Sequence, residues 1–268
     1  MSMNQSVLIC DQVNPVLNEI LEKNGLQITY EPEITPEQIQ DKIENFEVVI
    51  VRSRTKITKD MIDKATKCQI IARVGVGLDN IDQAAAKEKN IRVINAVEGA
   101  MNAVAELVIG LMLSLAREIP RADREVRNGN WIKKELMGTE LRGKYLGIVG
   151  LGNIGKRLGR LARALNMNII GYDVVPIDEE FSKEVGLMKA DLGTLLASSD
   201  YVSLHVPLLD STKHLINAEK MSTMKNTSRI INTSRGGVID ENALYEFLKD
   251  GKLGGAALAV FEVEPATS

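Results

Sequence analysis

Short apolar runs alternate with helix-like patterns from one end of the chain to the other. This alternation is typical of parallel strands connected by helices, so the sequence predicts an α/β protein. A first series of strands is expected over residues 7–10, 48–52, 70–73 and 92–94, with helices near 14–24, 36–43, 58–65 and 81–87. A second series is expected over residues 146–149, 169–172, 201–205, 229–232 and 255–260, again with helices between the strands.

The stretch between the two series, residues 102–126, is apolar along one broad face and is interrupted by Pro120. Proline lacks the backbone donor and clashes with the preceding turn, so a helix here should kink or restart. A helix this apolar is expected in a core, and it also offers a face for a second copy of the chain. We therefore expect a homodimer formed through residues 102–126.

A glycine-rich turn follows the strand expected at 146–149 and opens a helix. In such a turn the first glycine, Gly150, permits a tight bend, and the second, Gly152, lets the backbone approach a pyrophosphate. The third, Gly155, lets helix and strand pack closely. Asp173 ends the next strand, 18 residues after Gly155, where a carboxylate binds a ribose hydroxyl and repels a 2′-phosphate. The sequence thus predicts a site for NAD rather than NADP.

Composition narrows the expected partners to small molecules. A formal net charge of −3 provides no basic field for nucleic acid. No apolar run is expected to span a membrane, and the opening residues lack a leader-like pattern. The two cysteines, Cys10 and Cys68, lie in apolar runs at a spacing unlike that of metal ligands. We therefore expect a cytoplasmic protein without a metal site, whose cysteines are small core residues.

Motifs along the whole chain carry a resemblance to a known family. They are residues 51–56, 73–82 and 131–141, the glycine-rich turn, and residues 204–208, 232–237 and 260–265. In these segments and their order the chain resembles the D-2-hydroxyacid dehydrogenase family. The resemblance implies a flavodoxin-like substrate-binding domain over residues 1–97 and an NAD-binding Rossmann domain over residues 98–268, with its C-terminal part missing. Within the family, residues 137–141 favour the branch that oxidises D-3-phosphoglycerate, in the first step of serine synthesis.

Two charged residues are expected to act in catalysis. Oxidation of a 2-hydroxy acid requires a cation for the carboxylate, a base for the hydroxyl proton and a hydride acceptor held against the carbon. Arg235 suits the first role, because it follows an expected strand and its planar fork matches a carboxylate. The resemblance also implies that Arg235 is the catalytic arginine. It implies that Glu264, before Pro265, is the catalytic glutamate that holds and charges a histidine.

The catalytic histidine of the family lies in a Pro-His segment after that glutamate, and this segment is expected beyond Ser268. Neither His205 nor His214 falls in such a segment, and His205 is expected to be a structural residue at a strand end. The chain as given is therefore expected to bind NAD(H) but to turn over slowly, since a positioned acid–base group contributes much of the rate.

Further cofactor contacts follow only from the resemblance. They are Asn153, Ile154, Val206 and Thr233, together with Val76 from the first lobe. Ala259 stands near the nicotinamide, where the family usually has an aspartate. Alanine offers neither charge nor hydrogen bond, so the nicotinamide end is expected to be held less firmly.

The resemblance also implies substrate contacts in the first lobe. The turn from Gly75 through Val76 to Gly77 would present backbone N–H groups to the substrate carboxylate, as a glycine-rich anion-binding nest does. Arg52 and Ser53 would face the same substrate. A phosphate on the substrate needs cations, which Arg52 with Lys133 or Lys134 would supply; the alternative for these lysines is a solvated loop.

Two other functions stay open. A hydroxypyruvate or glyoxylate reductase would use the same catalytic groups without the phosphate cations. A binding module that senses NAD(H), like the transcriptional co-repressor relatives of the family, would need neither Arg235 nor Glu264. For either enzyme the expected partner is a small 2-hydroxy or 2-oxo acid.

Overall fold

The computed structural model describes residues 5–266, without the side chains of residues 97 and 98. The chain forms two compact units, Met1–Ala100 and Met101–Ser268. Each unit contains one parallel sheet with helices packed on it. The predicted α/β class with two parallel sheets is confirmed.

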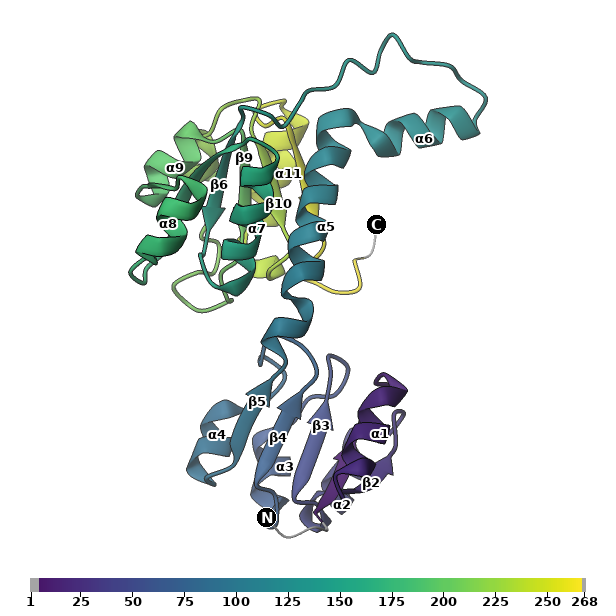
Figure 1. Ribbon diagram of the computed structural model, residues 1–268. Helices are drawn as coiled ribbons and strands as arrows, with labels where there is room; N and C mark the ends of the chain where they lie inside the picture. The colour runs from purple at the N-terminus through teal and green to yellow at the C-terminus, as the bar shows by residue number, and fades with distance from the viewer. Residues whose placement is uncertain (1–4, 267–268) are drawn as a thin grey trace. The chain divides into compact units, whose positions relative to one another are not determined.

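The sheet of the first unit has five parallel strands in the order β2-β1-β3-β4-β5 (Figure 1). This order is that of flavodoxin-like domains. The strands are β1 (Ser6–Ile9), β2 (Gln27–Tyr30), β3 (Val48–Val51), β4 (Ile70–Arg73) and β5 (Arg92–Asn95). The sequence pattern does not predict β2, because this edge strand is half exposed and carries no continuous apolar run.

The first two helices of the first unit begin at a side-chain cap. Asn14 accepts the backbone N–H of Val16 ahead of one helix, and Thr35 forms a reciprocal capping box with Gln38 ahead of the next. The helices are α1 (Pro15–Lys23), α2 (Pro36–Lys42), the 3-10 turn η1 (Ile43–Asn45), α3 (Lys59–Lys64) and α4 (Gln83–Glu88).

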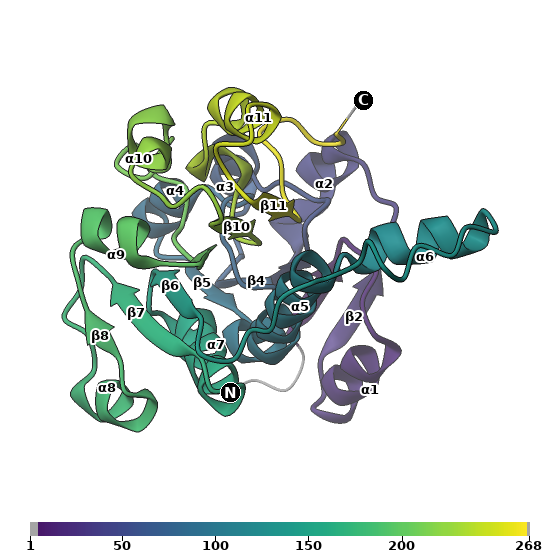
Figure 2. The same ribbon diagram turned by 90° about the horizontal axis from the view of Figure 1, so that it is seen from above.

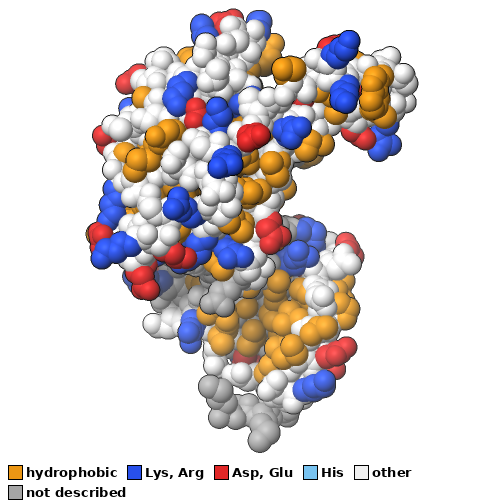
Figure 3. Space-filling view, turned by 45° about the horizontal axis from the view of Figure 1, so that its top comes forward, with side chains coloured by type: hydrophobic (Ala, Val, Ile, Leu, Met, Phe, Trp, Pro, Cys, Tyr) orange, Lys and Arg blue, Asp and Glu red, His pale blue; other side chains and the backbone are white. Residues whose placement is uncertain are grey.

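The two faces of this sheet are covered unequally. Residues of α2, α3 and α4 form a core with one face, around Leu8, Val49 and Ile71. The hydrophobic cluster on the other face contains residues of α1 and, among the described residues, of no other helix. Ile94 of β5 stays 40% exposed, and Figure 3 shows hydrophobic side chains gathered on the surface of this unit.

The sheet of the second unit has six parallel strands in the order β11-β10-β9-β6-β7-β8. Numbered from β6, this order is the 3-2-1-4-5-6 arrangement of the Rossmann fold. The strands are β6 (Tyr145–Val149), β7 (Asn168–Tyr172), β8 (Met188–Lys189), β9 (Tyr201–Leu204), β10 (Arg229–Asn232) and β11 (Gly255–Leu258). The sequence analysis missed β8, which is two exposed residues long and therefore gives no periodic pattern.

Helices cover both faces of this second sheet (Figure 2). They are α7 (Asn153–Ala164), α8 (Glu179–Val185), α9 (Leu192–Ser198), α10 (Ala218–Ser222), the 3-10 turn η2 (Gly236–Val238) and α11 (Glu241–Lys249). The carboxyl ends of β6, β9 and β10 lie side by side, because these strands are neighbours in a parallel sheet. Ligands of open α/β sheets bind at this edge.

The long apolar stretch forms α5 (Val97–Arg117), most of which belongs to the second unit, followed by α6 (Ile119–Arg127). Glu118 between them has a left-handed φ of 51°, and Pro120 lies in the first turn of α6. The predicted restart at Pro120 is therefore confirmed. In Figures 1 and 2, α6 and the loop after it stand away from the six-stranded sheet.

The expectation that no apolar run reaches membrane-spanning length is wrong. Residues Gly99–Arg117 of α5, with a mean hydropathy of 1.7, are long and apolar enough to cross a membrane by length and composition. However, one stripe of this helix, Ala105, Val108, Met112 and Ala116, is buried in the core of the second unit. This packing is that of a domain helix with one face in a protein core.

Both cysteines are free thiols in the core. Burial raises the pKa of Cys10 to about 12 and that of Cys68 to about 11. The thiolate is the reactive form, so both side chains are unreactive near neutral pH.

Candidate nucleotide-binding and catalytic site

The glycine-rich turn joins β6 to α7, and two of its glycines are required by the packing of the fold. Gly150 has a φ of +93°, and a Cβ there would lie 2.7 Å from the carbonyl oxygen of His205. A Cβ at Gly155 would lie 2.1 Å from the carbonyl oxygen of Gly150. Either contact is far below van der Waals distance, so a side chain at these positions would push α7 or β9 away from β6.

Gly152 differs from its two neighbours, because a Cβ there would meet nothing within 4 Å. Its φ of −68° is open to any residue, so the protein's own structure does not demand glycine. Gly152 is the N-cap of the twelve-residue α7, where backbone N–H groups and the helix dipole favour an anion. Space at this position therefore fits the approach of a pyrophosphate. Asn153 and Ile154 form the first turn of α7 directly beside it.

Asp173 lies against the same turn. Its Oδ2 accepts the backbone N–H of Leu151 at 2.6 Å, and its Oδ1 accepts the N–H of Val175 at 3.0 Å. A carboxylate offers about four acceptor positions, so these two bonds leave capacity for ribose hydroxyls. The contact with Leu151 also ties the end of β7 to the glycine turn.

The neighbouring strand ends supply the other predicted cofactor residues of this unit. Val206, after β9, approaches the turn closely enough that a Cβ at Gly150 would lie 3.0 Å from its Cγ1. Thr233, after β10, has a buried Oγ1 without a hydrogen-bond partner among the described residues. An unpaired buried hydroxyl is costly, so Thr233 Oγ1 fits a polar group of a bound cofactor. Ala259, after β11, donates its backbone N–H to Asn232 at 2.9 Å, and its methyl group adds no polar contact.

Arg235 lies on a loop that is held by three hydrogen bonds to the side-chain amide of Asn232. The Oδ1 of Asn232 accepts the N–H of Ser234 at 3.0 Å and its Oγ at 2.8 Å, while Nδ2 donates to the carbonyl of Arg235 at 2.8 Å. Asn232 is 1% exposed. Sequence reasoning missed this positioning role, although the residue opens the motif at 232–237 and an asparagine before a loop is a signal for such a turn.

The segment that carries Glu264 packs directly on this loop. A Cβ at Gly236 would lie 2.0 Å from the carbonyl carbon of Phe261, so only glycine allows the two backbones to touch. Glu264 is exposed, and its Oε1 accepts the N–H of Phe261 at 3.0 Å. The structure thus brings the backbone segments of Arg235 and Glu264 together within the second unit. Their catalytic roles stay predictions.

The two histidines have other partners. His205 bonds to the Oγ of Ser203 through Nε2 at 2.9 Å, and burial lowers its pKa to about 4. It is therefore neutral near pH 7, as expected of a structural histidine. His214 bonds through Nε2 to Glu262 Oε1 at 2.9 Å. That neither is the acid–base group stays a prediction.

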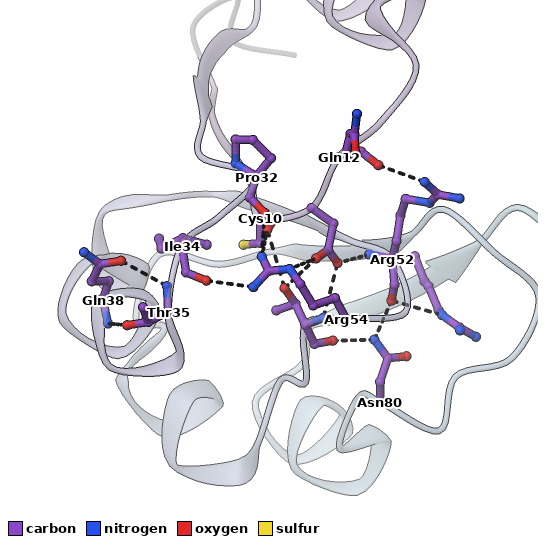
Figure 4. Close-up of polar contacts among 12 residues, drawn as sticks. Cys10, Gln12, Pro32, Ile34, Thr35, Gln38, Arg52, Arg54 and Asn80 are labelled. Carbon is purple, nitrogen blue, oxygen red and sulfur yellow. Dashed lines mark hydrogen bonds and ion pairs between the residues drawn. The ribbon is translucent and has the colours of Figure 1, made fainter. Parts of the chain in front are cut away.

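The predicted substrate residues of the first unit lie at the carboxyl ends of β3 and β4 (Figure 4). Arg52 is exposed, and its Nη1 donates to the carbonyl of Gln12 at 2.9 Å. Ser53 Oγ accepts from Arg73 Nη2 at 3.3 Å. These contacts leave further donors of the Arg52 guanidinium open to a ligand.

In the turn from Gly75 through Val76 to Gly77, the N–H of Gly75 already has a hydrogen-bond acceptor within the protein. It donates to the carbonyl of Arg73 at 3.0 Å, while Asn95 Nδ2 donates to the carbonyl of Val76. Among the described residues no hydrogen bond uses the N–H groups of Val76 and Gly77. These two N–H groups would therefore make the predicted contact with a substrate carboxylate.

Comparison with known proteins agrees with this geometry. The sequence profile of the D-isomer specific 2-hydroxyacid dehydrogenase NAD-binding domain matches residues 109–268, which include the glycine turn, Asp173, Arg235 and Glu264. The chain belongs to the D-isomer specific 2-hydroxyacid dehydrogenase family. The predicted family and the prediction of NAD as the cofactor are confirmed.

Relatives with different substrates are about equally similar to the chain. It is 45% identical over 260 residues to D-3-phosphoglycerate dehydrogenase of Methanocaldococcus jannaschii, covering 97% of this chain and 49% of that protein. It is 46% identical over 248 residues to hydroxypyruvate reductase of Thermotoga maritima, covering 92% of this chain and 79% of that protein. The chain spans about half the length of the phosphoglycerate dehydrogenases it matches.

The fold comparison reaches the same family. The crystal structure of a glyoxylate reductase from Paecilomyes thermophila matches with a TM-score of 0.91 at 30% identity. The match covers 100% of this chain and 84% of that one.

The three glycines give a test that separates cofactor binding from folding. We expect Gly152→Ala to leave the thermal unfolding of the chain nearly unchanged but to weaken NADH binding at least about tenfold, because the methyl group would occupy the path of the pyrophosphate. We expect Gly155→Ala to destabilise the second unit by about 1–3 kcal/mol, because its methyl group has no space. Calorimetric titration and thermal unfolding measure the two effects.

The matched control is Gly110→Ala in α5, where a Cβ would meet nothing within 4 Å. This change should leave NADH binding intact, because Gly110 lies outside the glycine-rich turn. Unchanged NADH affinity in Gly152→Ala would show that the cofactor does not approach the backbone at this turn.

Asp173 gives a second test, of the choice between NADH and NADPH. We expect NADH to bind more tightly, because the 2′-phosphate of NADPH would meet a carboxylate, a like-charge contact costing several kcal/mol at close range. Asp173→Asn keeps an acceptor for a backbone N–H but removes the charge, so it should reduce the difference in affinity between NADH and NADPH. Equal affinities of the unmodified chain for the two cofactors, measured by calorimetry, would exclude Asp173 from this role.

Proposed function

We propose that the protein interconverts a D-2-hydroxy acid and its 2-oxo acid with NAD(H). The observation that carries this proposal is the packing of residues 261–264 on the Arg235 loop, at the same sheet edge as the glycine turn. A protein that only senses NAD(H) would need the turn and Asp173 but not this second arrangement. The two thiols support a cytoplasmic location for the reaction.

In the proposed oxidation, the C2 hydroxyl loses its proton to a base, and C2 loses a hydride. The hydride passes to NAD when the cofactor is bound. Arg235 binds the substrate carboxylate and stabilises the negative charge that develops on the C2 oxygen. Glu264 holds the histidine that the family uses as its acid–base group and favours its protonated form.

As the substrate we propose D-3-phosphoglycerate, which would be oxidised to 3-phosphohydroxypyruvate. A phosphate requires cations, and Arg52 with Lys133 or Lys134 is proposed to supply them. Among the described residues neither lysine has an ion-pair partner. Reduction of hydroxypyruvate or glyoxylate is the second candidate, favoured by the similarity to the Thermotoga maritima enzyme. That reaction would leave these cations without a role.

We further propose a homodimer formed through the region of α5 and α6. Leu107 and Leu113 of α5 and Ile119 and Val126 of α6 are large hydrophobic residues exposed on this unit. The loop after α6 adds Trp131, which is 81% exposed. Exposed apolar side chains gathered on one region are typical of protein–protein contacts.

The substrate proposal is tested by the ratio of kcat/KM for phosphohydroxypyruvate to that for hydroxypyruvate in the full-length protein. We expect a ratio well above one, and Arg52→Ala should remove much of this preference while hardly changing the reaction of the unphosphorylated acid. Lys42→Ala is the control, since it removes a cation of the same unit that pairs with Glu31. A better rate with hydroxypyruvate would favour the second candidate.

The dimer proposal is tested by sedimentation. The chain should sediment with twice its mass of 29.4 kDa, and Leu107→Lys with Leu113→Lys should give monomers, because two charges would be buried in the contact. Tyr245→Lys on α11 is the control for an exposed apolar residue outside the region. A monomeric parent chain would contradict the proposal.

A further inference from the structure

A buried carboxylate, Asp11, lies directly after β1 and outside every motif of the family resemblance. It is 3% exposed. A charge taken out of water is costly unless it is paired and hydrogen-bonded. Asp11 is paired: its Oδ1 lies 3.0 Å from Arg54 Nε and accepts Thr55 Oγ1 at 2.8 Å. Its Oδ2 accepts the backbone N–H groups of Arg52 and Thr55.

The side chain of Arg54 is 48% exposed, but its guanidinium is held by four partners in this region (Figure 4). Besides its contact with Asp11, Nη1 donates to the carbonyl of Ile34 at 3.1 Å. Nη2 donates to the carbonyls of Cys10 and Pro32. The planar guanidinium thus joins the loops after β1, β2 and β3, a role that the point charge of a lysine cannot fill.

Arg52, two residues away, is also exposed, but its side chain is held by fewer contacts. Its backbone is held on both sides: Asp11 accepts its N–H, and its carbonyl accepts Asn80 Nδ2 at 2.7 Å and Arg73 Nε at 3.3 Å. Its side chain, in contrast, makes one hydrogen bond among the described residues, to the carbonyl of Gln12. Arg52, Ser53 and Arg54 line a surface recess together with residues 11–12 and 32–33. Of the two arginines that line it, Arg52 has the guanidinium with fewer hydrogen bonds to the protein.

We propose that Asp11 is a positioning residue for the substrate anion, acting through Arg52. Its carboxylate fixes the backbone that carries Arg52 and Ser53. Arg54 neutralises the charge of Asp11. The Asp11 carboxylate therefore does not attract the Arg52 guanidinium away from a ligand. Of the two arginines, Arg52 therefore presents its charge to the substrate and Arg54 holds the support. This inference rests on the substrate role proposed above for Arg52.

The test compares steady-state kinetics with phosphohydroxypyruvate in the full-length protein. We expect Asp11→Asn to raise KM about tenfold with kcat nearly unchanged, because binding of the anion is lost in ground state and transition state alike. Affinity for NADH, which binds the second unit, should not change. Combined with Arg52→Ala, Asp11→Asn should add little, since both changes remove the same contact.

Milder variants keep the test valid if Asp11→Asn does not fold. Thr55→Val removes one bond to Asp11 at nearly constant volume, and Arg54→Lys keeps the charge but loses the carbonyl contacts. Both should raise KM by about threefold, through the same coupling to Arg52. Glu31→Gln is the matched control, an acid-to-amide change in the same unit at a carboxylate that pairs with Lys42, and it should leave KM unchanged.

Three outcomes would overturn the proposal, and they can be told apart. If Arg52→Ala raises KM but Asp11→Asn and Thr55→Val do not, Asp11 has no positioning role while the substrate role of Arg52 stands. An additive effect of Asp11→Asn and Arg52→Ala would also reject action through Arg52. If Arg52→Ala itself leaves KM unchanged, the substrate role of Arg52 fails, and the inference fails with it.

Discussion

The second unit depends on backbone passing backbone at distances that leave no room for a side chain. At Gly155, α7 lies so close to the end of β6 that a Cβ would overlap the Gly150 carbonyl. At Gly236, the segment from Phe261 crosses the Arg235 loop in the same way. The first approach aims the N-terminus of α7 at the sheet edge, and the second brings the segment of Glu264 to Arg235. Both parts of the candidate site therefore rest on sterics rather than on strong polar contacts.

In the first unit, the main constraint is the burial of the Asp11 carboxylate. Asp11 is kept in the interior by Arg54, Thr55 and backbone N–H groups, and in return it organises the loops after three strands. Removing one partner of such a cluster leaves the other buried and unpaired, which is far more costly than the cluster is stabilising. The backbone position of Arg52 therefore depends on the whole cluster.

Anion recognition in this protein thus uses two kinds of donor. The pyrophosphate of the cofactor is proposed to meet backbone N–H groups at the start of α7, where glycine gives access. The carboxylate and phosphate of the substrate are proposed to meet arginine side chains, whose planar forks suit these groups. Asn232 and Asp11 play equivalent parts in this scheme, because each is a buried polar side chain that shapes the loop of one arginine.

The sequence by itself determined the α/β class, the glycine turn and the family, and it predicted nine of the eleven strands found in residues 5–266. Apolar runs and short motifs are local signals. It could not reveal β2 and β8, which are short and exposed, nor Asp11, whose partners lie about forty residues away along the chain. For α5 the sequence predicted a place in a core, but its length and composition also suit a membrane-crossing helix, and only the structure shows which stripe is buried. Only the tertiary structure decided these points, because burial and long-range pairing depend on which segments meet in space.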